Sequence, residues 1–475
     1  MKSSLLPFII FLLIACQVPK EETTQDSESP LNFIIIFCDD LGYGDLSSFG
    51  NPVIKTPNLD RMVMEGQKWT QFYVADPVCT PSRSALMTGR YPIRTGMTSK
   101  ERAVLFPDSG SGLSPDEITI AEMLKQKEYA TAHVGKWHLG HLPQFLPTSQ
   151  GFDYYYGIPY SNDMNAAEGK SRLYRENMVD PDFYPETQNY NVPLMENEEI
   201  IEQPADQTTI TKRYTEKAVQ YIREQQEQPF FLYLAHSMPH IPLFASEKFV
   251  GTSKRRLYGD VIEEIDWSVG QVIATLKELG LEDNTIVMFS SDNGPWLSFK
   301  THGGSTGPLR AGKGTTFEGG QRVPTIFWGP GNVVPGIVTG MGSTLDIINT
   351  FGALAQVEVP NDRKMDGFDL SPVLKGEGAS PRSEFYYWAF SELHAVRSGP
   401  WKLHIQQREP VYYGKTVDME APELYHIEAD ISEMYDRFEA EPQLVANLQQ
   451  KIREHLKDVE DATPDQLVIR IEAVD

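Results

Sequence analysis

The chain has 475 residues, of which 40% are hydrophobic and 23% are charged, and its formal net charge at pH 7 is −24. This length suits one elaborate α/β domain with an appendage, or two to three domains. The acidic balance excludes the basic surface of a nucleic-acid-binding protein, so no nucleic acid partner is expected. An anionic substrate would need a local cluster of Arg, Lys and His. Three cysteines are too few for a disulfide framework.

The first 15 residues have the pattern of an export signal. Lys2 precedes the apolar run LLPFIIFLLIA (5–15), which is too short to cross a bilayer as a helix. The run ends in L-I-A-C (13–16), which resembles a bacterial lipobox and implies cleavage before Cys16 and lipidation of that cysteine. The alternative is an ordinary signal peptide that is cut nearby. Residues 16–30 are then a polar, flexible tether.

This N-terminal segment predicts where the protein resides. We expect an exported bacterial lipoprotein, in the periplasm or at the outer-membrane or cell surface. Because the mature chain contains no other long apolar run, its only expected membrane contact is the lipid anchor.

Four near-continuous apolar runs follow, and each is succeeded by chemically active side chains. They are LNFIIIFC (31–38), YATAHVG (129–135), FFLYLAH (230–236) and TIVMFSS (285–291). Such runs predict strands that are buried on both faces. Helical patterns at 114–127, 206–226 and 258–280 lie between them, the first opening on a Ser114–Glu117 capping box. Alternating strands and helices predict a large, mixed but mainly parallel sheet flanked by helices.

Near residue 380 the pattern changes. Residues 384–390, 394–406 and 422–430 have the composition of short strands joined by tight turns, and a helical pattern follows at 442–457. We therefore predict a main domain at 31–380 and a C-terminal α+β subdomain at 381–475, with a small antiparallel sheet and a helix. The aromatic residues at 385–390 are expected to pack within this sheet.

Polar residues that follow the four runs are expected to meet at one edge of the main sheet, because the carboxyl ends of parallel strands converge there. They are Asp39, Asp40, Lys136, His138, His240, Asp292 and Asn293. The oxygen ligands among them suit a hard divalent cation, Ca²⁺ first and Mg²⁺ second. The alternative for Asp39 and Asp40 alone is a strand-end turn. Cys38 and His133 are expected to be core residues.

The stretch VCTPSRSALMTGR (78–90) places Cys79 at the start of a predicted helix, with Arg83 one turn further on. A helix N-terminus beside a guanidinium favours an oxyanion. A thiolate at Cys79 would be a soft ligand and is poorly matched to a hard-metal oxygen site.

The segment C-T-P-S-R (79–83) resembles the C-x-P-S-R signature of the type I sulfatases. Other blocks resemble that family in its order: DDLGYGDL (39–46), GKWHLG (135–140), SDNGP (291–295) and LRAGKGTTFEGGQRVP (309–324). The resemblance implies the alkaline-phosphatase-like sulfatase fold and the hydrolysis of sulfate esters. It also implies that a separate formylglycine-generating maturase oxidises Cys79 to 3-oxoalanine (formylglycine), whose hydrated form offers a hard oxygen in place of sulfur.

The resemblance further assigns roles to individual residues. Cys79, Asp39, Asp40, Asp292 and Asn293 would hold the metal. Arg83 and Lys136 would hold the diol and the sulfate charge, His240 and Lys313 would stabilise or protonate the leaving group, and His138 would take the proton of the second hydroxyl, which expels sulfate. Ser161, within GIPYSND (157–163), would touch sulfate. His302 is a candidate for a sugar subsite, or a loop histidine without a catalytic role.

The expected substrates are sulfated polysaccharides or their oligosaccharides, such as ulvan, carrageenan or glycosaminoglycans. The loops at 98–113 and 160–205 are expected to set the sulfate position, with 160–205 either a substrate-facing lid or surface decoration. Two other functions are open at this point. One is a phosphonate or phosphate ester hydrolase that uses the same modified cysteine, and the other is a non-catalytic glycan-binding lipoprotein.

Overall fold

The computed structural model describes residues 30–409, 414–417, 419–460 and 465–471. The predicted signal segment, the predicted lipidation site Cys16 and the predicted tether up to residue 29 lie outside the described residues. Within the described ranges the strands form a ten-stranded sheet, a four-stranded sheet and a two-stranded ribbon. No helix among these residues is long and apolar enough to cross a membrane.

The large sheet has the strand order β10-β2-β9-β8-β1-β7-β3-β4-β5-β6. Its strands are β1 (Asn32–Cys38), β2 (Gln67–Tyr73), β3 (Ala130–Gly135), β4 (Tyr154–Gly157), β5 (Leu194–Glu196), β6 (Glu199–Glu202), β7 (Phe230–Ala235), β8 (Thr285–Ser291), β9 (Arg322–Trp328) and β10 (Gly336–Ser343). The neighbours from β8 to β4 run parallel, whereas β9 is antiparallel to both β8 and β2. The predicted mixed, mainly parallel sheet is confirmed.

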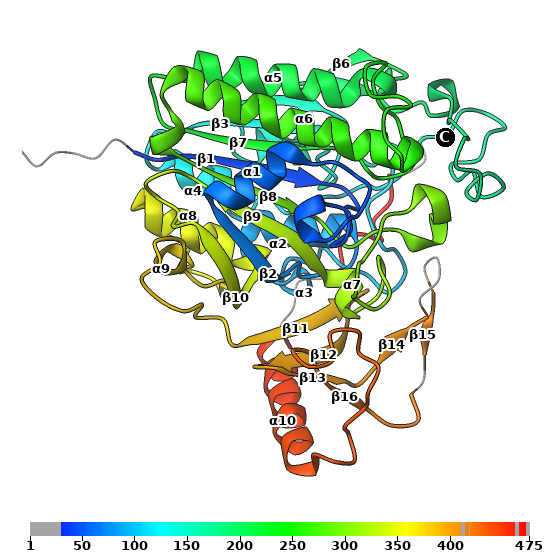
Figure 1. Cartoon of the computed structure of the whole chain (residues 1–475), viewed down its shortest axis with the longest axis vertical. Coiled ribbons are helices and arrows are strands. Elements are labelled where there is room, and N and C mark those ends of the chain that lie inside the picture. Colours follow the sequence, from blue (N-terminus) through cyan, green and yellow to red (C-terminus); the bar gives the residue numbers. More distant parts are fainter. Residues whose placement is uncertain (1–29, 410–413, 418, 461–464, 472–475) are drawn as a thin grey trace, which may run out of the picture.

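Helices cover both faces of this sheet (Figure 1). On one face, α1 (Pro57–Glu65), α5 (Ile210–Glu224) and α6 (Arg256–Leu279) share a core with Ile34 and Ile36 of β1. On the other, α2 (Cys79–Thr88), α4 (Ile120–Lys125) and α8 (Ile347–Ala355) share a core with Phe33 and Ile35. Successive residues of β1 thus point into two apolar layers, which explains its unbroken apolar sequence. The shorter helices are α3 (Pro92–Thr95), α7 (Glu318–Gln321) and α9 (Ser371–Leu374).

The predicted start of the helix at residue 114 is wrong. The helix α4 begins at Ile120, and its capping box joins Thr119 to Glu122. Glu117 instead forms ion pairs with Arg90 and Arg363. Because Glu117 pairs with these two arginines, it does not cap a helix. Residues 114–117 therefore form a turn and not the start of a helix.

The smaller sheet has the order β11 (Glu384–Ala389), β12 (Glu392–Ser398), β13 (Trp401–His404) and β16 (Glu423–His426), and α10 (Pro442–Asp458) packs on it. All three strand pairings are antiparallel, as predicted. Phe385 and Tyr387 are fully buried in a core shared with Tyr73 of the large sheet, which confirms their packing role. The ribbon consists of β14 (Gln407–Arg408) and β15 (Thr416–Val417).

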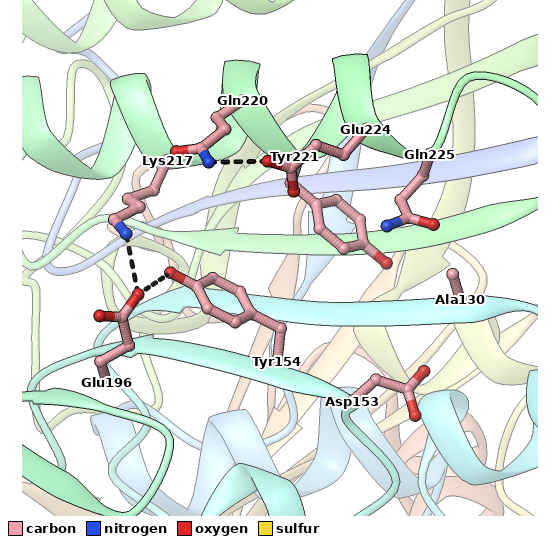
Figure 2. A pocket seen from close by; sticks show the side chains of 9 residues that line it. All are labelled: Ala130, Asp153, Tyr154, Glu196, Lys217, Gln220, Tyr221, Glu224 and Gln225. Carbon is pink, nitrogen blue, oxygen red and sulfur yellow. Dashed lines mark hydrogen bonds and ion pairs between the residues drawn. The ribbon is translucent and has the colours of Figure 1, made fainter.

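A cavity of about 330 Å³ lies between the end of α5 and the first residues of β3 and β4 (Figure 2). Its polar lining is largely self-paired, because Glu196 accepts hydrogen bonds from both Lys217 and Tyr154. This cavity is at the amino ends of the parallel strands. The polar residues singled out in the sequence follow the carboxyl ends, on the opposite edge of the sheet.

Candidate active site

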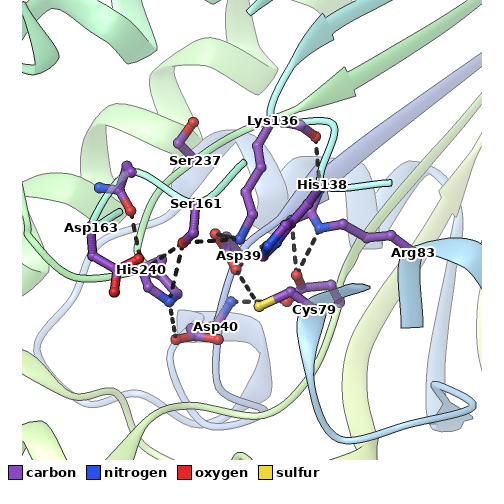
Figure 3. Close-up of polar contacts among 12 residues, drawn as sticks. Asp39, Asp40, Cys79, Arg83, Lys136, His138, Ser161, Asp163, Ser237 and His240 are labelled. Carbon is purple, nitrogen blue, oxygen red and sulfur yellow. Dashed lines mark hydrogen bonds and ion pairs between the residues drawn. The ribbon is translucent and has the colours of Figure 1, made fainter. Parts of the chain in front are cut away.

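The side chains that follow β1 and β3 meet the start of α2 in one buried cluster (Figure 3). Asp292, which follows β8, joins it by pairing with Arg83 of α2. The strands bring them together because β1 pairs with β8 up to Cys38 and Ser291, and β3 and β1 both pair with β7 up to Ala235. Asp39, Lys136 and Asp292 are each the first residue beyond their strand. Residues that are distant in the sequence therefore become neighbours.

Three carboxylates in the cluster each pair with a different cation. Asp39 Oδ2 lies 2.5 Å from Lys136 Nζ, and Asp40 Oδ1 lies 2.7 Å from Lys313 Nζ. Asp292 Oδ2 lies 2.9 Å from Arg83 Nη2. All six side chains are almost fully buried. Because an unpaired buried charge is costly, this pairing is what allows so many ionic groups to coexist in the protein interior.

Cys79 stands at the centre of these pairs as the first residue of α2, whose ten residues are all buried. Its Sγ is 3.4 Å from Lys313 Nζ and 3.5 Å from Asp39 Oδ1. Val78 before it is extended, so the chain enters the helix at Cys79. Burial raises the pKa of the Cys79 thiol well above its ordinary value, so the unmodified side chain is a neutral thiol here.

The neighbouring carboxyls Asp39 and Asp40 differ in acidity. Burial alone would raise the pKa of Asp39, but the cations around it, Lys136 first and then Arg83, hold it well below its usual range. The pKa of Asp40 is raised to about 7, chiefly by burial and further by Asp39 and Asp292, with Lys313 only partly offsetting them. Asp40 is thus the carboxyl whose ionised form its surroundings support less, and a bound cation would favour that form.

The two predicted catalytic histidines have defined tautomers. His138 Nε2 is 2.9 Å from the Leu105 carbonyl, which can only accept, so Nε2 carries the hydrogen and the buried, unpartnered Nδ1 carries the lone pair. His240 Nδ1 is 2.5 Å from the Ile241 carbonyl, which turns Nε2 toward Asp40 Oδ2 at 3.7 Å. Burial lowers the pKa of both rings, so both are neutral. His138 therefore has an unprotonated Nδ1 without a hydrogen-bond partner among the described residues.

The two predicted substrate-binding residues are placed differently. Ser161 Oγ lies within the cluster, 3.3 Å from Lys136 Nζ and 3.4 Å from His240 Nδ1. His302 is buried in an aromatic layer, where its Nδ1 is 3.0 Å from the Tyr174 hydroxyl and its ring stacks on Phe183. Burial lowers the pKa of His302 to about 4. Its contacts are thus with the 160–205 insertion and not with the acidic cluster.

Part of the cluster could hold a metal ion. Ligand atoms of Asp39, Asp40, Cys79 and His240 lie within 4.8 Å of one another. Asn293 donates through Nδ2 to Asp40 Oδ1 at 2.6 Å, while its buried Oδ1 has no hydrogen-bond partner. An orphaned amide oxygen beside carboxylates is what an oxygen-coordinated ion such as Ca²⁺ would satisfy.

Two further residues at the cluster were not predicted individually. Asp163 is buried, with one oxygen 3.3 Å from Arg172 and the other unpartnered. Trp296 lies against His240, with ring centroids 5.4 Å apart, and under Lys313 Nζ at 4.5 Å. Both were within reach of the sequence, because one ends GIPYSND and the other directly follows SDNGP.

The residues expected to be structural are in the core. His133 is fully buried among the rings of Trp137, Tyr155 and Tyr233, and burial lowers its pKa. Cys38 is fully buried and points into the apolar layer that contains Ile34 and Ile36.

Two models of known protein families match this chain. The family model described as Sulfatase matches residues 31–357, and the model described as C-terminal region of aryl-sulfatase matches residues 380–470. The chain belongs to the sulfatase family. It is therefore an enzyme that hydrolyses sulfate esters.

Characterised sulfatases are similar over most of the chain. Arylsulfatase A of Bos taurus is 39% identical over 450 residues, covering 90% of this chain and 87% of that protein. N-acetylgalactosamine-6-sulfatase of Homo sapiens is 41% identical over 385 residues, covering 79% of this sulfatase and 71% of the human protein.

Solved structures of similar proteins include carbohydrate complexes. Ps i-CgsB in complex with k-i-k-neocarrahexaose is 31% identical with a TM-score of 0.78, covering 94% of this chain and 96% of that one. PsFucS1 sulfatase from Pseudoalteromonas sp. is 27% identical with a TM-score of 0.80, covering 91% of each chain.

Proposed function

We propose that this sulfatase removes sulfate from sulfated polysaccharides or their oligosaccharides, with formylglycine made from Cys79 as the nucleophile and Ca²⁺ as the metal. The observation that carries this proposal is the position of Cys79. It begins a buried helix amid Lys313, Asp39 and the oxygen ligands, where an unmodified neutral thiol is a poor nucleophile.

The cation would be held by Asp39, Asp40, Asp292, Asn293 and the modified Cys79, and when bound it supplies Lewis acidity toward the sulfate and the nucleophile. His240, whose Nε2 lies 3.7 Å from Asp40 Oδ2, would act on the leaving group beside this cation.

The cationic side chains would stabilise the negative charge of the sulfate. Arg83 and Lys136 bring fixed positive charge to the place where the sulfate would lie, and preorganised charge of this kind is usually a large catalytic contribution. Ser161 offers a hydroxyl beside Lys136. His138, whose Nδ1 has no hydrogen-bond partner among the described residues, would take a proton from the modified side chain. Lys313, whose Nζ is 3.4 Å from Cys79 Sγ, would stabilise the departing oxygen.

The proposed substrate class rests on similarity and on the 160–205 insertion. Ps i-CgsB has been solved with a neocarrahexaose, and a related Bacteroides structure with 28% identity and a TM-score of 0.76 concerns glycosaminoglycan metabolism. The insertion leaves the site after Asp163 and contacts His302 through Tyr174 and Phe183. A segment in that position can act as a lid that contacts the sugar.

The substrate is tested by a screen of sulfated galactan and glycosaminoglycan oligosaccharides, in which released sulfate and the position of the lost group are measured together. Release from at least one carbohydrate is expected. Aryl sulfate, aryl phosphate and aryl phosphonate are assayed beside them. Faster turnover of the phosphorus esters than of every sulfate ester would contradict the proposal.

The nucleophile is tested with Cys79→Ala in protein co-expressed with a maturase. We expect loss of sulfate release to background, because no aldehyde can form, with an unchanged circular dichroism spectrum. Mass spectrometry of the wild-type Cys79 peptide should show the aldehyde. Turnover retained by the alanine variant would rule the mechanism out.

We also propose that Cys16 carries a lipid anchor, on the strength of the L-I-A-C segment. Cys16→Ala should move the protein from the membrane fraction to the soluble fraction and abolish incorporation of labelled fatty acid. An unchanged distribution would show that the segment is an ordinary signal.

A further inference from the structure

The loop that delivers Lys313 to the active site is held by the C-terminal sheet. Lys313 lies between β8 and α7, and no strand end positions it. Its backbone N–H donates to the Pro295 carbonyl at 3.0 Å, and the next N–H, that of Gly314, donates to the Pro77 carbonyl at 3.0 Å. These bonds fix the middle of the loop against segments next to Asn293 and Cys79, but they leave its two ends to be anchored.

Both ends are anchored by residues of the C-terminal subdomain. At the start, the Pro308 carbonyl accepts from Ser432 Oγ at 2.6 Å, and Arg310 Nη1 donates to the Glu433 carbonyl at 2.7 Å. At the end, the Thr316 carbonyl accepts from Lys402 Nζ at 2.8 Å. Residues 308–316 around Lys313 are thus tied to β13 and to the turn after β16.

A buried ionic triad lies at the second anchor. Lys402 Nζ is 3.0 Å from Glu318 Oε1 and 2.9 Å from Glu433 Oε1, and all three side chains are fully buried. Glu433 Oε2 also accepts from the Glu318 backbone N–H at 2.7 Å, at the first residue of α7. Glu433 therefore fixes the loop through its carboxylate at one end and its carbonyl at the other.

We propose that Lys402 and Glu433 are positioning residues for Lys313, so that the C-terminal subdomain is a working part of the catalytic apparatus. The inference rests on the proposed role of Lys313 at the leaving group. A buried charge triad is costly to maintain, and two apolar residues would hold the subdomains together as well. What the triad adds is a fixed geometry for the Thr316 carbonyl and the Glu318 N–H, three and five residues beyond Lys313. A displacement of about 1 Å at a catalytic group can cost on the order of 100-fold in rate.

The test uses two substrates that differ in leaving group, an aryl sulfate and a sugar sulfate. A group that stabilises the departing oxygen matters most when that oxygen leaves poorly, so Lys313→Ala should reduce kcat on the sugar sulfate by roughly 100-fold and on the aryl sulfate much less. Lys402→Met should show the same selectivity, with roughly a tenfold loss of kcat on the sugar sulfate and little change in KM. A merely structural role would lower both rates together.

The double variant Lys313→Ala/Lys402→Met decides whether Lys402 acts through Lys313. We expect it to be no slower than Lys313→Ala alone, because the second substitution has nothing left to misplace. Lys451→Met is the matched control, since Lys451 pairs with Glu384 in the same subdomain away from the loop, and its rates should equal those of the wild type. Aldehyde content and thermal unfolding are measured for every variant.

These results distinguish the proposed role of Lys313 at the leaving group from the positioning role of Lys402 and Glu433. If Lys313→Ala shows no leaving-group selectivity, the proposed role of Lys313 is wrong. If it does, and Lys402→Met loses both rates equally or adds fully to Lys313→Ala, the positioning role is wrong. Should Lys402→Met not fold, Glu433→Gln enters the same cycle, because it keeps an acceptor for the Glu318 N–H and removes a single charge.

Discussion

At the scale of single residues, Asn293 links the geometry of the site to metal binding. Its amide nitrogen is committed to Asp40 and to the Gly294 carbonyl, which leaves the buried oxygen as the atom without a partner. An unsatisfied buried acceptor costs about 1–3 kcal/mol, so a site of this kind is built for a ligand.

We predict that Ca²⁺ raises the melting temperature of the wild type and that Asn293→Ala diminishes this rise. Binding to the folded state alone stabilises by about 2.7 kcal/mol at a ligand concentration of 100 Kd, and loss of one ligand weakens the affinity on which that gain depends. The measurement is thermal unfolding in chelator and after Ca²⁺ is added back, with Mg²⁺ in parallel.

Asn32→Ala is the matched control for this prediction. Asn32 is also a buried asparagine, but it lies at the opposite end of β1 and donates to Thr285 Oγ1. It should lower the melting temperature equally with and without Ca²⁺. Identical Ca²⁺ responses of Asn293→Ala and the wild type would remove Asn293 from the metal site.

Much of the site could be predicted at this scale because its residues follow strands with unmistakable apolar sequences. Asp39, Lys136 and Asp292 each lie one residue beyond such a strand. Lys313 could be proposed only through the family resemblance, because its loop has no periodic pattern of its own. Glu433 and Lys402 gave no local signal at all, since their importance lies in contacts with distant residues.

At the scale of elements, α2 determines where Cys79 stands. The helix ends at Gly89, whose φ of +67° places it in the left-handed region, and its N–H donates to the Ala85 carbonyl. A Cβ on Gly89 would come within 2.3 Å of Ile348 in α8. The end of the helix is therefore fixed by both backbone conformation and packing.

Gly89→Ala is predicted to destabilise the protein by more than the cost of its backbone conformation, which is about 1–2 kcal/mol for a left-handed alanine. Gly280→Ala, at the end of α6, is the matched comparison, because Gly280 has the same φ of +67° and nothing within 4 Å of an added Cβ. Chemical denaturation measures both. If both variants lose the same free energy of unfolding, α8 moves to accommodate the added methyl group.

Helix boundaries also show where local sequence fails. A Ser-x-x-Glu pattern at 114–117 has the form of a capping box, yet the fold uses Thr119 and Glu122, one turn later. Tertiary contacts determine where this helix begins, because Glu117 forms ion pairs with Arg90 and Arg363. By contrast, α5 and α6 were predictable, since long amphipathic patterns outweigh single competing contacts.

At the scale of the whole molecule, the ten-stranded and the four-stranded sheets are joined by buried charged residues. Glu318, before β9, accepts hydrogen bonds from the hydroxyls of Tyr73 and Tyr387, one from each sheet, and pairs with Lys402 of β13. The sequence predicted both sheets but not this junction, because a pairing between distant charged residues leaves no periodic trace.

The junction should make the protein sensitive to acid. Burial alone would raise the pKa of Glu318, but Lys402, Arg322 and Arg397 outweigh it and hold that pKa well below the ordinary 4.5. A carboxyl whose pKa is lower in the folded state contributes stability that is present above its unfolded pKa and is lost as the pH falls toward the folded value. The contribution of Glu318 is thus complete at neutral pH and declines below about pH 4.5.

Glu318→Gln is therefore predicted to be clearly less stable than the wild type at pH 7, with the difference narrowing as the pH falls from 4.5 toward 3. The narrowing arises because the wild-type carboxyl becomes protonated and then resembles the amide. Melting temperatures across this range measure it. Glu278→Gln, which removes an exposed partner of Arg223, should differ little from the wild type at any pH, since solvent screens that pair. A stability gap for Glu318→Gln that stays constant down to pH 3 would mean that the carboxylate charge does not hold the two sheets together.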